Sequence, residues 1–379
     1  MFRFVIVVLS LVLIAVSASP TVAGSPEVKF TSLGQVYVGR ISPNGSTVVG
    51  RTQTTDQAFR WTADSGFALF DLDHFVGAST DGSLLVGESD NGDVFQWTPA
   101  SGLEPMNVPD HFTPTNISAN GRFLSGYSSL NNSFVPVLLD TIGSSFLVPY
   151  LSSGKAGGTA LSVSEDGKFV VGSLGFKNPA DWIARASEAF RWDAGHGTIG
   201  LGDLPGGPFY SRAFDVSGDG SVVVGESISG ASAANSPHQN DTEGFYWTDP
   251  TGMVGIGDLP GGPFFSVIDA VSADGSIMVG TSISDRAQEA IIYDLKHGMR
   301  PLQDVLVDKY GLANELAGWQ LESAFDISAD GRTVAGMARD PQGHYTAWVV
   351  TVPEPSTYAL LTIGGAALAV YARQRRHRT

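Results

Sequence analysis

The sequence predicts an all-β protein: a seven-bladed β-propeller built from four-stranded repeats, with an N-terminal signal helix and a C-terminal transmembrane helix. Three observations support this: a turn phrase occurs seven times, alternating strands follow it, and long apolar runs stand only at the two chain ends. The 379 residues include 46 glycines and only 16% charged residues, which is typical of tight turns joining short strands. An open β-solenoid is the alternative architecture.

The turn phrase reads Ser, any residue, Asp or Asn, Gly, one more residue, three mostly apolar residues and a final Gly. Its first glycines are Gly45, Gly82, Gly121, Gly167, Gly220, Gly275 and Gly331, so the repeat length ranges from 37 to 56 residues. Asp-Gly and Asn-Gly supply the positive φ angles of tight hairpins. A calcium loop is the alternative, but it needs several oxygen ligands at alternating positions, whereas each copy carries one Asp or Asn. We therefore expect turns here and no bound metal.

A second phrase, at 58–61, 94–97, 189–192 and 244–247, predicts the third strand of a blade because apolar residues alternate at period two. A glycine-containing turn and a fourth strand ending in Leu follow it. A Leu-ended strand also opens the mature chain at 28–34, and the third-strand phrase closes it at 345–350. We therefore expect the N-terminal strand to complete the last blade, which removes the free edges of an open array.

The first 24 residues predict a secretory signal peptide. Arg3 precedes the apolar run 4–16, and small residues follow with candidate cleavage points after Ala18 or Ala23. An uncleaved anchor is the alternative, although the run is short of the ~20 residues that a membrane span needs.

The last 27 residues have three parts. Pro353, Glu354 and Pro355 come first, and the prolines favour an extended, accessible segment because they cannot donate backbone hydrogen bonds. The uncharged run 357–372 then predicts a transmembrane segment. The chain ends with a cluster that would stop translocation, namely Arg373, Arg375, Arg376 and Arg378.

This order resembles the PEP-CTERM sorting signal over residues 352–379. The resemblance implies a Gram-negative producer of exopolysaccharide and processing by an exosortase, a membrane cysteine-type transpeptidase or protease. It also implies export across the inner membrane, a transient membrane anchor, and delivery to the cell surface or extracellular matrix. A plain C-terminal anchor preceded by a chance Pro-Glu-Pro is the alternative.

The repeats at 28–351 resemble the extracellular HAF family. The match is clearest at Gly-Asp-Leu-Pro-Gly-Gly, residues 202–207 and 257–262, and at the Ser-x-Asp-Gly turns. Gln57 and Glu188 stand where that family has His, so His cannot be a required ligand here. The resemblance implies export and a repeat scaffold, and it assigns no activity.

Three segments are therefore expected: a signal peptide at 1–24, the repeat propeller at 25–352 and the sorting tail at 353–379. The net charge of −16 argues against nucleic acid or an anionic membrane as a partner. Cysteine is absent, so core packing has to hold the exported domain together. A short helix is expected after Pro301, packed on the ring.

No familiar catalytic motif occurs, and the histidines fall at unlike places in the repeat, so no catalytic residue, metal or cofactor is predicted. The repeat pattern predicts equivalent positions just before the turns for Asp215, Asp269 and Asp326, where they could ring an opening or satisfy turn amides.

The preferred function is a non-catalytic binding or structural scaffold linked to exopolysaccharide, biofilm or other surface proteins. The alternative is a propeller enzyme, a carbohydrate hydrolase or lyase with its site in the channel mouth. Carboxylates with perturbed pKa values at one mouth would favour the enzyme.

Overall fold

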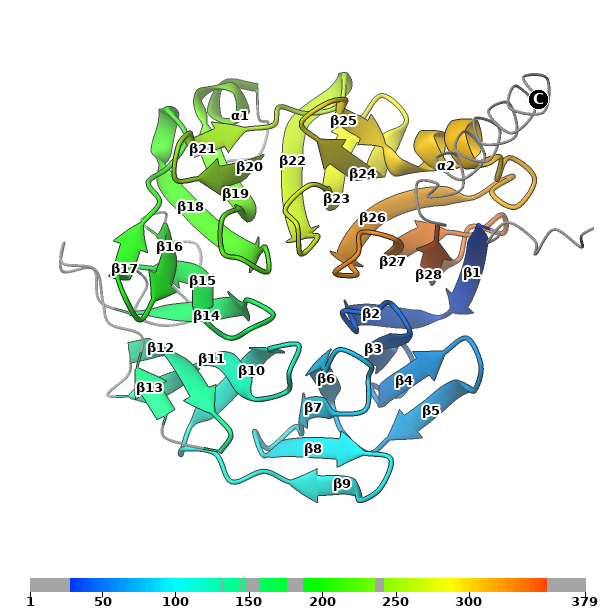
Figure 1. Cartoon of the computed structure of the whole chain (residues 1–379). Coiled ribbons are helices and arrows are strands. Elements are labelled where there is room, and N and C mark those ends of the chain that lie inside the picture. The colour runs from blue at the N-terminus through cyan, green and yellow to red at the C-terminus, as the bar shows by residue number, and fades with distance from the viewer. Residues whose placement is uncertain are drawn as a thin grey trace, which may run out of the picture.

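Seven four-stranded antiparallel sheets stand in a ring around a central channel (Figure 1). The computed structural model describes residues 28–130, 133–142, 145–147, 157–175, 187–235 and 242–352, so the predicted signal peptide and sorting tail lie outside the described residues. This arrangement confirms the seven-bladed propeller, and the alternative of an open solenoid was wrong. No helix in the described ranges is long and apolar enough to cross a membrane.

In six blades the strands stand in chain order from the channel axis outwards, and in the last blade the N-terminal strand is added at the outside (Figure 1). The first three blades comprise β2 (Val36–Ile41), β3 (Thr47–Thr52), β4 (Ala58–Thr62) and β5 (Gly66–Phe70); β6 (His74–Ala78), β7 (Leu85–Glu88), β8 (Val94–Thr98) and β9 (Gly102–Pro105); and β10 (Phe112–Ile117), β11 (Phe123–Leu130), β12 (Ser133–Asp140) and β13 (Ser145–Leu147). The next two comprise β14 (Gly158–Val163), β15 (Phe169–Leu174), β16 (Glu188–Asp193) and β17 (Gly197–Gly200); and β18 (Gly206–Val216), β19 (Val223–Ser229), β20 (Glu243–Thr248) and β21 (Gly252–Gly255). The last two comprise β22 (Gly261–Val271), β23 (Met278–Ser284), β24 (Ala287–Asp294) and β25 (Gly298–Pro301); and β26 (Gln320–Ile327), β27 (Thr333–Arg339), β28 (Tyr345–Thr351) and β1 (Lys29–Gly34).

The last blade closes the ring with both ends of the described chain. Strand β1 pairs antiparallel with β28, from Lys29 opposite Thr351 to Ser32 opposite Trp348, which confirms the predicted closure. Leu33 is buried with residues of the first and last blades, and the Phe30 ring lies 6.4 Å from that of Trp348. Pairing β1 therefore covers an edge that would otherwise offer unpaired backbone groups.

The turn phrase builds the hairpin between the first and second strand of every blade. In one copy, Ser217 Oγ donates to Asp219 Oδ1 (2.9 Å) and accepts from the amide of Val222 (3.0 Å), while Asp219 Oδ1 accepts from the amide of Ser221 (2.9 Å). All seven copies repeat these three bonds, so the predicted turn is confirmed. The φ angle is positive at Gly220 (72°) and not at Asp219, so the Asp supplies an acceptor, not the backbone angle.

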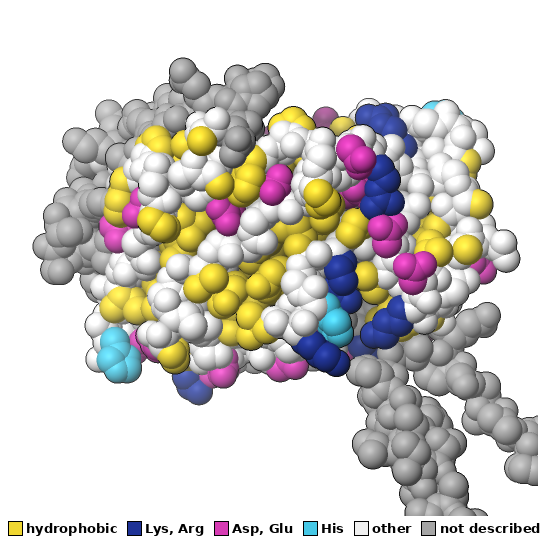
Figure 2. Space-filling view, turned by 90° about the horizontal axis from the view of Figure 1, so that it is seen from above, with side chains coloured by type: hydrophobic (Ala, Val, Ile, Leu, Met, Phe, Trp, Pro, Cys, Tyr) yellow, Lys and Arg dark blue, Asp and Glu magenta, His cyan; other side chains and the backbone are white. Residues whose placement is uncertain are grey.

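Apolar cores lie between neighbouring blades, each built from facing strands. Helix α2 (Leu302–Tyr310) buries Leu302 and Leu306 in the core that contains Trp348, which confirms a short helix packed on the ring. Helix α1 (Gly230–Asn235) follows β19. On the side seen in Figure 2, hydrophobic side chains gather in a band between scattered acidic and basic ones.

Candidate functional site

A β-bulge near the end of each innermost strand shapes the central channel. The bulged residues, one per blade, are Gly39, Val76, Thr115, Leu161, Phe214, Asp269 and Phe325. The residues directly after them are Arg40, Gly77, Asn116, Ser162, Asp215, Ala270 and Asp326. Because a bulge re-aims consecutive side chains, these two sets face different parts of the channel.

The final glycine of each turn phrase lies opposite the bulge. A Cβ at these glycines would stand 1.8–2.7 Å from a carbonyl oxygen of the innermost strand, which no side chain tolerates. The seven are Gly50, Gly87, Gly126, Gly172, Gly225, Gly280 and Gly336. Glycine at this place in the repeat therefore leaves room for the bulge, and the bulged residues line the channel.

The channel opens into two cavities of different size. All seven bulged residues line a wide funnel of about 1020 Å³ at one mouth. A narrow pocket of about 80 Å³ at the other mouth is lined from all seven blades and includes Asp215, Asp326 and Glu165. Arg40 lines both cavities and marks the boundary between them.

A ring of backbone hydrogen bonds surrounds the narrow mouth. It joins the second residue of successive turns, as in Ala329 N to Pro43 O (2.8 Å) and Ala273 N to Ala329 O (2.9 Å). Further bonds run from Gly218 to Ala273 and from Thr80 to Ala119. In the first blade the second turn residue is Pro43, which has no amide hydrogen, and the next residue, Asn44, donates to Thr80 O instead (3.0 Å). Among the described residues this ring is open only beside Glu165, the one turn residue of this set with a charged side chain.

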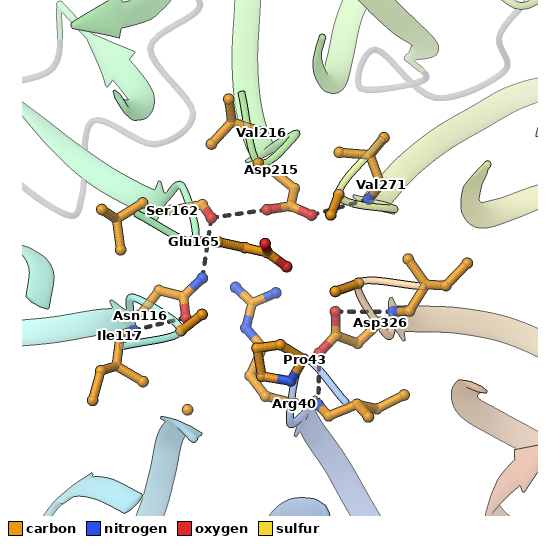
Figure 3. Close-up of a pocket in the computed structure, with 18 of the residues that line it drawn as sticks. Arg40, Pro43, Asn116, Ile117, Ser162, Glu165, Asp215, Val216, Val271 and Asp326 are labelled. Carbon is orange, nitrogen blue, oxygen red and sulfur yellow. Dashed lines mark hydrogen bonds between the residues drawn. The ribbon is translucent and has the colours of Figure 1, made fainter. Parts of the chain in front are cut away.

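Asp215 and Asp326 tie blades together at the narrow mouth (Figure 3). Asp326 accepts from the amides of Ile41 (2.6 Å) and Ile327 (3.0 Å), and Asp215 accepts from the amide of Val271 (2.9 Å) and from Ser162 Oγ (2.8 Å). The two carboxylates therefore do satisfy amides, but mainly those of other blades. Burial raises the pKa of Asp326 to about 6, against the opposing effects of Arg40 and the amides, and burial also raises the pKa of Asp215.

Asp269 is not equivalent to these two residues, so that part of the sequence interpretation was wrong. It precedes its turn serine by three residues instead of two, which makes it the bulged residue that faces the funnel. Its Oδ2 is buried without a hydrogen-bond partner. Burial, followed by the nearby Glu226 carboxylate, raises the pKa of Asp269 to about 8.

Arg40 extends its guanidinium group into the middle of the channel, between Glu165, Asp215 and Asp326 (Figure 3). Within the described ranges it forms no ion pair closer than 4.0 Å. Its longer-range attraction still opposes the rise in the pKa values of Asp215 and Asp326 that burial causes. Burial raises the pKa of Glu165, and the neighbouring Asp166 and Asp215 raise it further. The sequence offered no signal for Arg40, because the ring alone brings residue 40 to these acids.

The funnel wall combines aromatic and charged groups. The Arg212 guanidinium carbon lies 5.1 Å from the centre of the Phe214 ring, and Arg212 stands 3.6 Å from Glu226. Tyr210 Oη donates to Glu226 (2.8 Å). Burial raises the pKa of Tyr210, and Glu226 adds to that shift.

The histidines that the structure describes do not gather at the channel. His196 and His297 lie in equivalent outer hairpins, where each is hydrogen-bonded to an Asp three residues earlier. The expectation that the histidines fall at unlike places in the repeat therefore does not hold for these two. His74 lines the funnel beside Asp73 (3.0 Å). No group of three or more His, Asp or Glu side chains in the described part of the chain is arranged to hold a metal ion.

The family model that matches the chain is the PEP-CTERM protein-sorting motif, over residues 351–376. The match includes Pro353, Glu354 and Pro355, and of the basic cluster Arg373, Arg375 and Arg376, whereas Arg378 lies beyond it. This motif marks an exported, extracellular protein that is processed by an exosortase and reaches the surface by way of a C-terminal anchor. The match does not reach the repeats, so the HAF-type resemblance stays a prediction.

No curated protein matches the sequence. Among solved structures, TolB from Acinetobacter baumannii is similar at 13% identity and a TM-score of 0.41, covering 68% of this chain and 60% of that one. The β-propeller domain of Cps50 (Swd1) from Myceliophteria thermophila reaches 13% identity and 0.46, covering 86% and 98%. Hydrazine synthase from Kuenenia stuttgartiensis reaches 14% and 0.48, covering 86% and 96%. Likenesses of this degree carry no information about function.

Proposed function

We propose that this chain is an extracellular binding scaffold whose ligand, a matrix polysaccharide or another surface component, enters the funnel at the wide mouth of the channel. The observation that carries this proposal is the cavity of about 1020 Å³ on a chain with the sorting motif. A concave site that mixes aromatic surface with a few polar groups is the usual form of a ligand site. The link to exopolysaccharide and biofilm is part of this proposal.

The test uses the exported protein purified from the producing cells and their own exopolysaccharide, with surface proteins in a second arm. Phe214→Ala and Phe325→Ala remove apolar area from the funnel, so we expect each to weaken binding by about tenfold. Leu295→Ala is the matched control, because Leu295 is 72% exposed and does not line the funnel. Melting curves identify any variant that has lost its fold. A wild-type protein that binds neither material contradicts the proposal.

A second function, a carbohydrate hydrolase or lyase, is favoured by one observation. Asp269 faces the funnel and Asp326 the narrow pocket of the same channel, with pKa values raised to about 8 and about 6, and separated pKa values suit a general acid and a general base. Release of reducing or unsaturated sugar ends from the exopolysaccharide measures this activity. Loss of that release in Asp269→Asn and Asp326→Asn would support this function. Release from both variants at the wild-type rate would exclude these two residues as its acid and base.

A further inference from the structure

Asp269 is the only acid among the seven bulged residues that line the funnel. Its counterparts in the other blades are glycine, valine, threonine, leucine and two phenylalanines. The one other polar member, Thr115, is satisfied by the carbonyl of Ala160 (2.8 Å) and by Ser125 (3.0 Å). Asp269 Oδ2 has no partner of this kind. Oδ2 is the buried part of a side chain that is otherwise half-buried and faces the funnel, so an ionised carboxylate would lose the hydration of this oxygen without a compensating hydrogen bond, which favours the neutral form.

On balance, the charged groups around Asp269 also raise its pKa. Glu226 on β19 and Asp326 on β26 raise its pKa, whereas Arg40 on β2 lowers it. Arg212 on β18 stands 3.6 Å from Glu226 and neutralises part of that charge. With burial as the largest effect, the pKa reaches about 8, so the group is a neutral carboxylic acid at pH 7. A neutral acid can donate a hydrogen bond, which a carboxylate cannot.

We propose that the part of the funnel around Asp269, Phe214 and Phe325 is a subsite for an uncharged, polyhydroxylated ligand, such as the end of a neutral sugar chain. In this subsite Asp269 donates a hydrogen bond to one of the ligand's hydroxyl groups. In this subsite the apolar faces of the ligand lie against Phe325 and against the Phe214 ring with Arg212 stacked on it. The inference deepens the proposed binding role and rests on it.

The lining of the funnel argues for this ligand class. Asp73, Glu88 and Asp90 on its wall outnumber the lining arginines Arg40 and Arg212, and this excess of negative charge disfavours an anionic chain such as a polyuronate. A cationic ligand would be attracted fully only by an ionised Asp269, whereas the neutral acid offers it no charge. A sugar end instead offers hydroxyl groups that can accept from Asp269 and donate to the wall carboxylates, together with C–H faces for the aromatic rings. The cavity of about 1020 Å³ is large enough for several sugar residues.

A pH dependence follows directly from this arrangement. Below pH 8 the acid keeps its proton and the bond to the ligand forms. Above pH 8 the proton leaves, the donor is lost, and affinity falls by up to about tenfold per pH unit. An asparagine at this position keeps an N–H donor at every pH, so Asp269→Asn removes the pH dependence and retains binding.

The experiment measures binding of cellohexaose and maltohexaose, as neutral probes, and of a uronic-acid hexamer to the exported protein from pH 6 to pH 10. Wild type is compared with Asp269→Asn and Asp269→Ala, and with Asp308→Asn as a control on the exposed side of helix α2. We expect a neutral probe to bind wild type at pH 6, to weaken above pH 8, and to bind Asp269→Asn equally across the range. Asp269→Ala should bind weakly at every pH, and the control should follow wild type.

A second measurement does not depend on any ligand. The infrared difference spectrum between wild type and Asp269→Asn at pH 7 should contain the C=O band of a protonated carboxylic acid. A carboxylate band instead overturns the inference. It is also overturned if neither neutral probe binds, if the uronic-acid hexamer binds more tightly, or if Asp269→Asn keeps the wild-type pH profile. The binding experiment with the cells' own exopolysaccharide and surface proteins tests the proposed scaffold function separately. Failure of the Asp269 subsite can therefore be told apart from failure of the binding function.

Discussion

The Asp326 carboxylate accepts a hydrogen bond from the backbone amide of Ile41 at 2.6 Å and so joins the last blade of the ring to the first. The two residues are 285 positions apart in the chain. Asp326 also accepts from its neighbour Ile327, so one side chain satisfies two amides at the closure. It supplements the pairing of β1 with β28 in the same blade.

Replacing Asp326 with alanine should therefore destabilise the ring. The change leaves the buried amide of Ile41 without its charged acceptor, which costs about 2–3 kcal/mol. Chemical unfolding of the purified protein measures this, with Asp308→Ala on the exposed side of α2 as the control. A loss no larger than that of the control would contradict the role assigned to Asp326.

Asp326 and Asp269 should each lower the stability of the fold as the pH rises from about 4 to about 8. The folded protein holds protons on Asp326 and Asp269, with pKa values of about 6 and about 8, which the unfolded chain releases near 3.8. The unfolded state therefore binds fewer protons in this window, and each group lowers the free energy of unfolding by up to about 1.4 kcal/mol per pH unit. Melting temperatures of wild type and Asp269→Asn across this range test the prediction. The Asn variant should show the smaller decline between pH 6 and pH 8.

Substitution of Gly220 with alanine should disrupt its turn more than the same change at Gly298. Both glycines have positive φ (72° and 70°), so alanine is strained at each by about 1–2 kcal/mol. At Gly220 the new Cβ would also stand 2.3 Å from the Phe169 ring of the preceding blade, whereas at Gly298 it would meet nothing within 4 Å. Denaturant midpoints of the two variants separate clash from strain. Equal midpoints would show that a Cβ at Gly220 does not clash with the Phe169 ring of the preceding blade.

Leu33→Ala should weaken the closure of the ring by about 2–5 kcal/mol, because Leu33 is buried between the first and last blades. The matched control is Leu295→Ala, which removes the same atoms from an exposed site. Limited proteolysis should release β1 earlier in the Leu33 variant than in the control. Unchanged protection of β1 would mean that this side chain does not hold the closing strand.

Replacing Pro353, Glu354 and Pro355 together with alanine should block removal of the tail. The processing enzyme then lacks its recognition segment, and the protein should keep residues up to Thr379 in the cell membrane fraction. Mass spectrometry of the C-terminal peptide in membrane and medium measures the outcome, with Leu295→Ala processed normally. Appearance of the shortened protein in the medium would show that the tripeptide is not required.

The fold was predictable because its signals are local. Each Ser-x-Asp-Gly phrase makes its hydrogen bonds within six residues, as in the bonds from Ser217 to Asp219 and from Val222 to Ser217, so a short stretch specifies its own hairpin. Seven such phrases set the number of blades. The Leu-ended strand at the start and the third-strand phrase at the end set the closure, because each needs the other to complete a sheet.

The channel was decided only by the tertiary structure. Arg40, Asp215 and Asp326 meet because the ring brings the ends of separate innermost strands to one axis. Asp269 differs from Asp215 by a single step relative to its turn, and a β-bulge converts that step into a different cavity and a different pKa. Sequence by itself determined the repeat, the turns and the sorting motif, since these depend on neighbouring residues. Which acids face which mouth, and which of them keeps its proton, depends on bulge register, burial and charges from other blades.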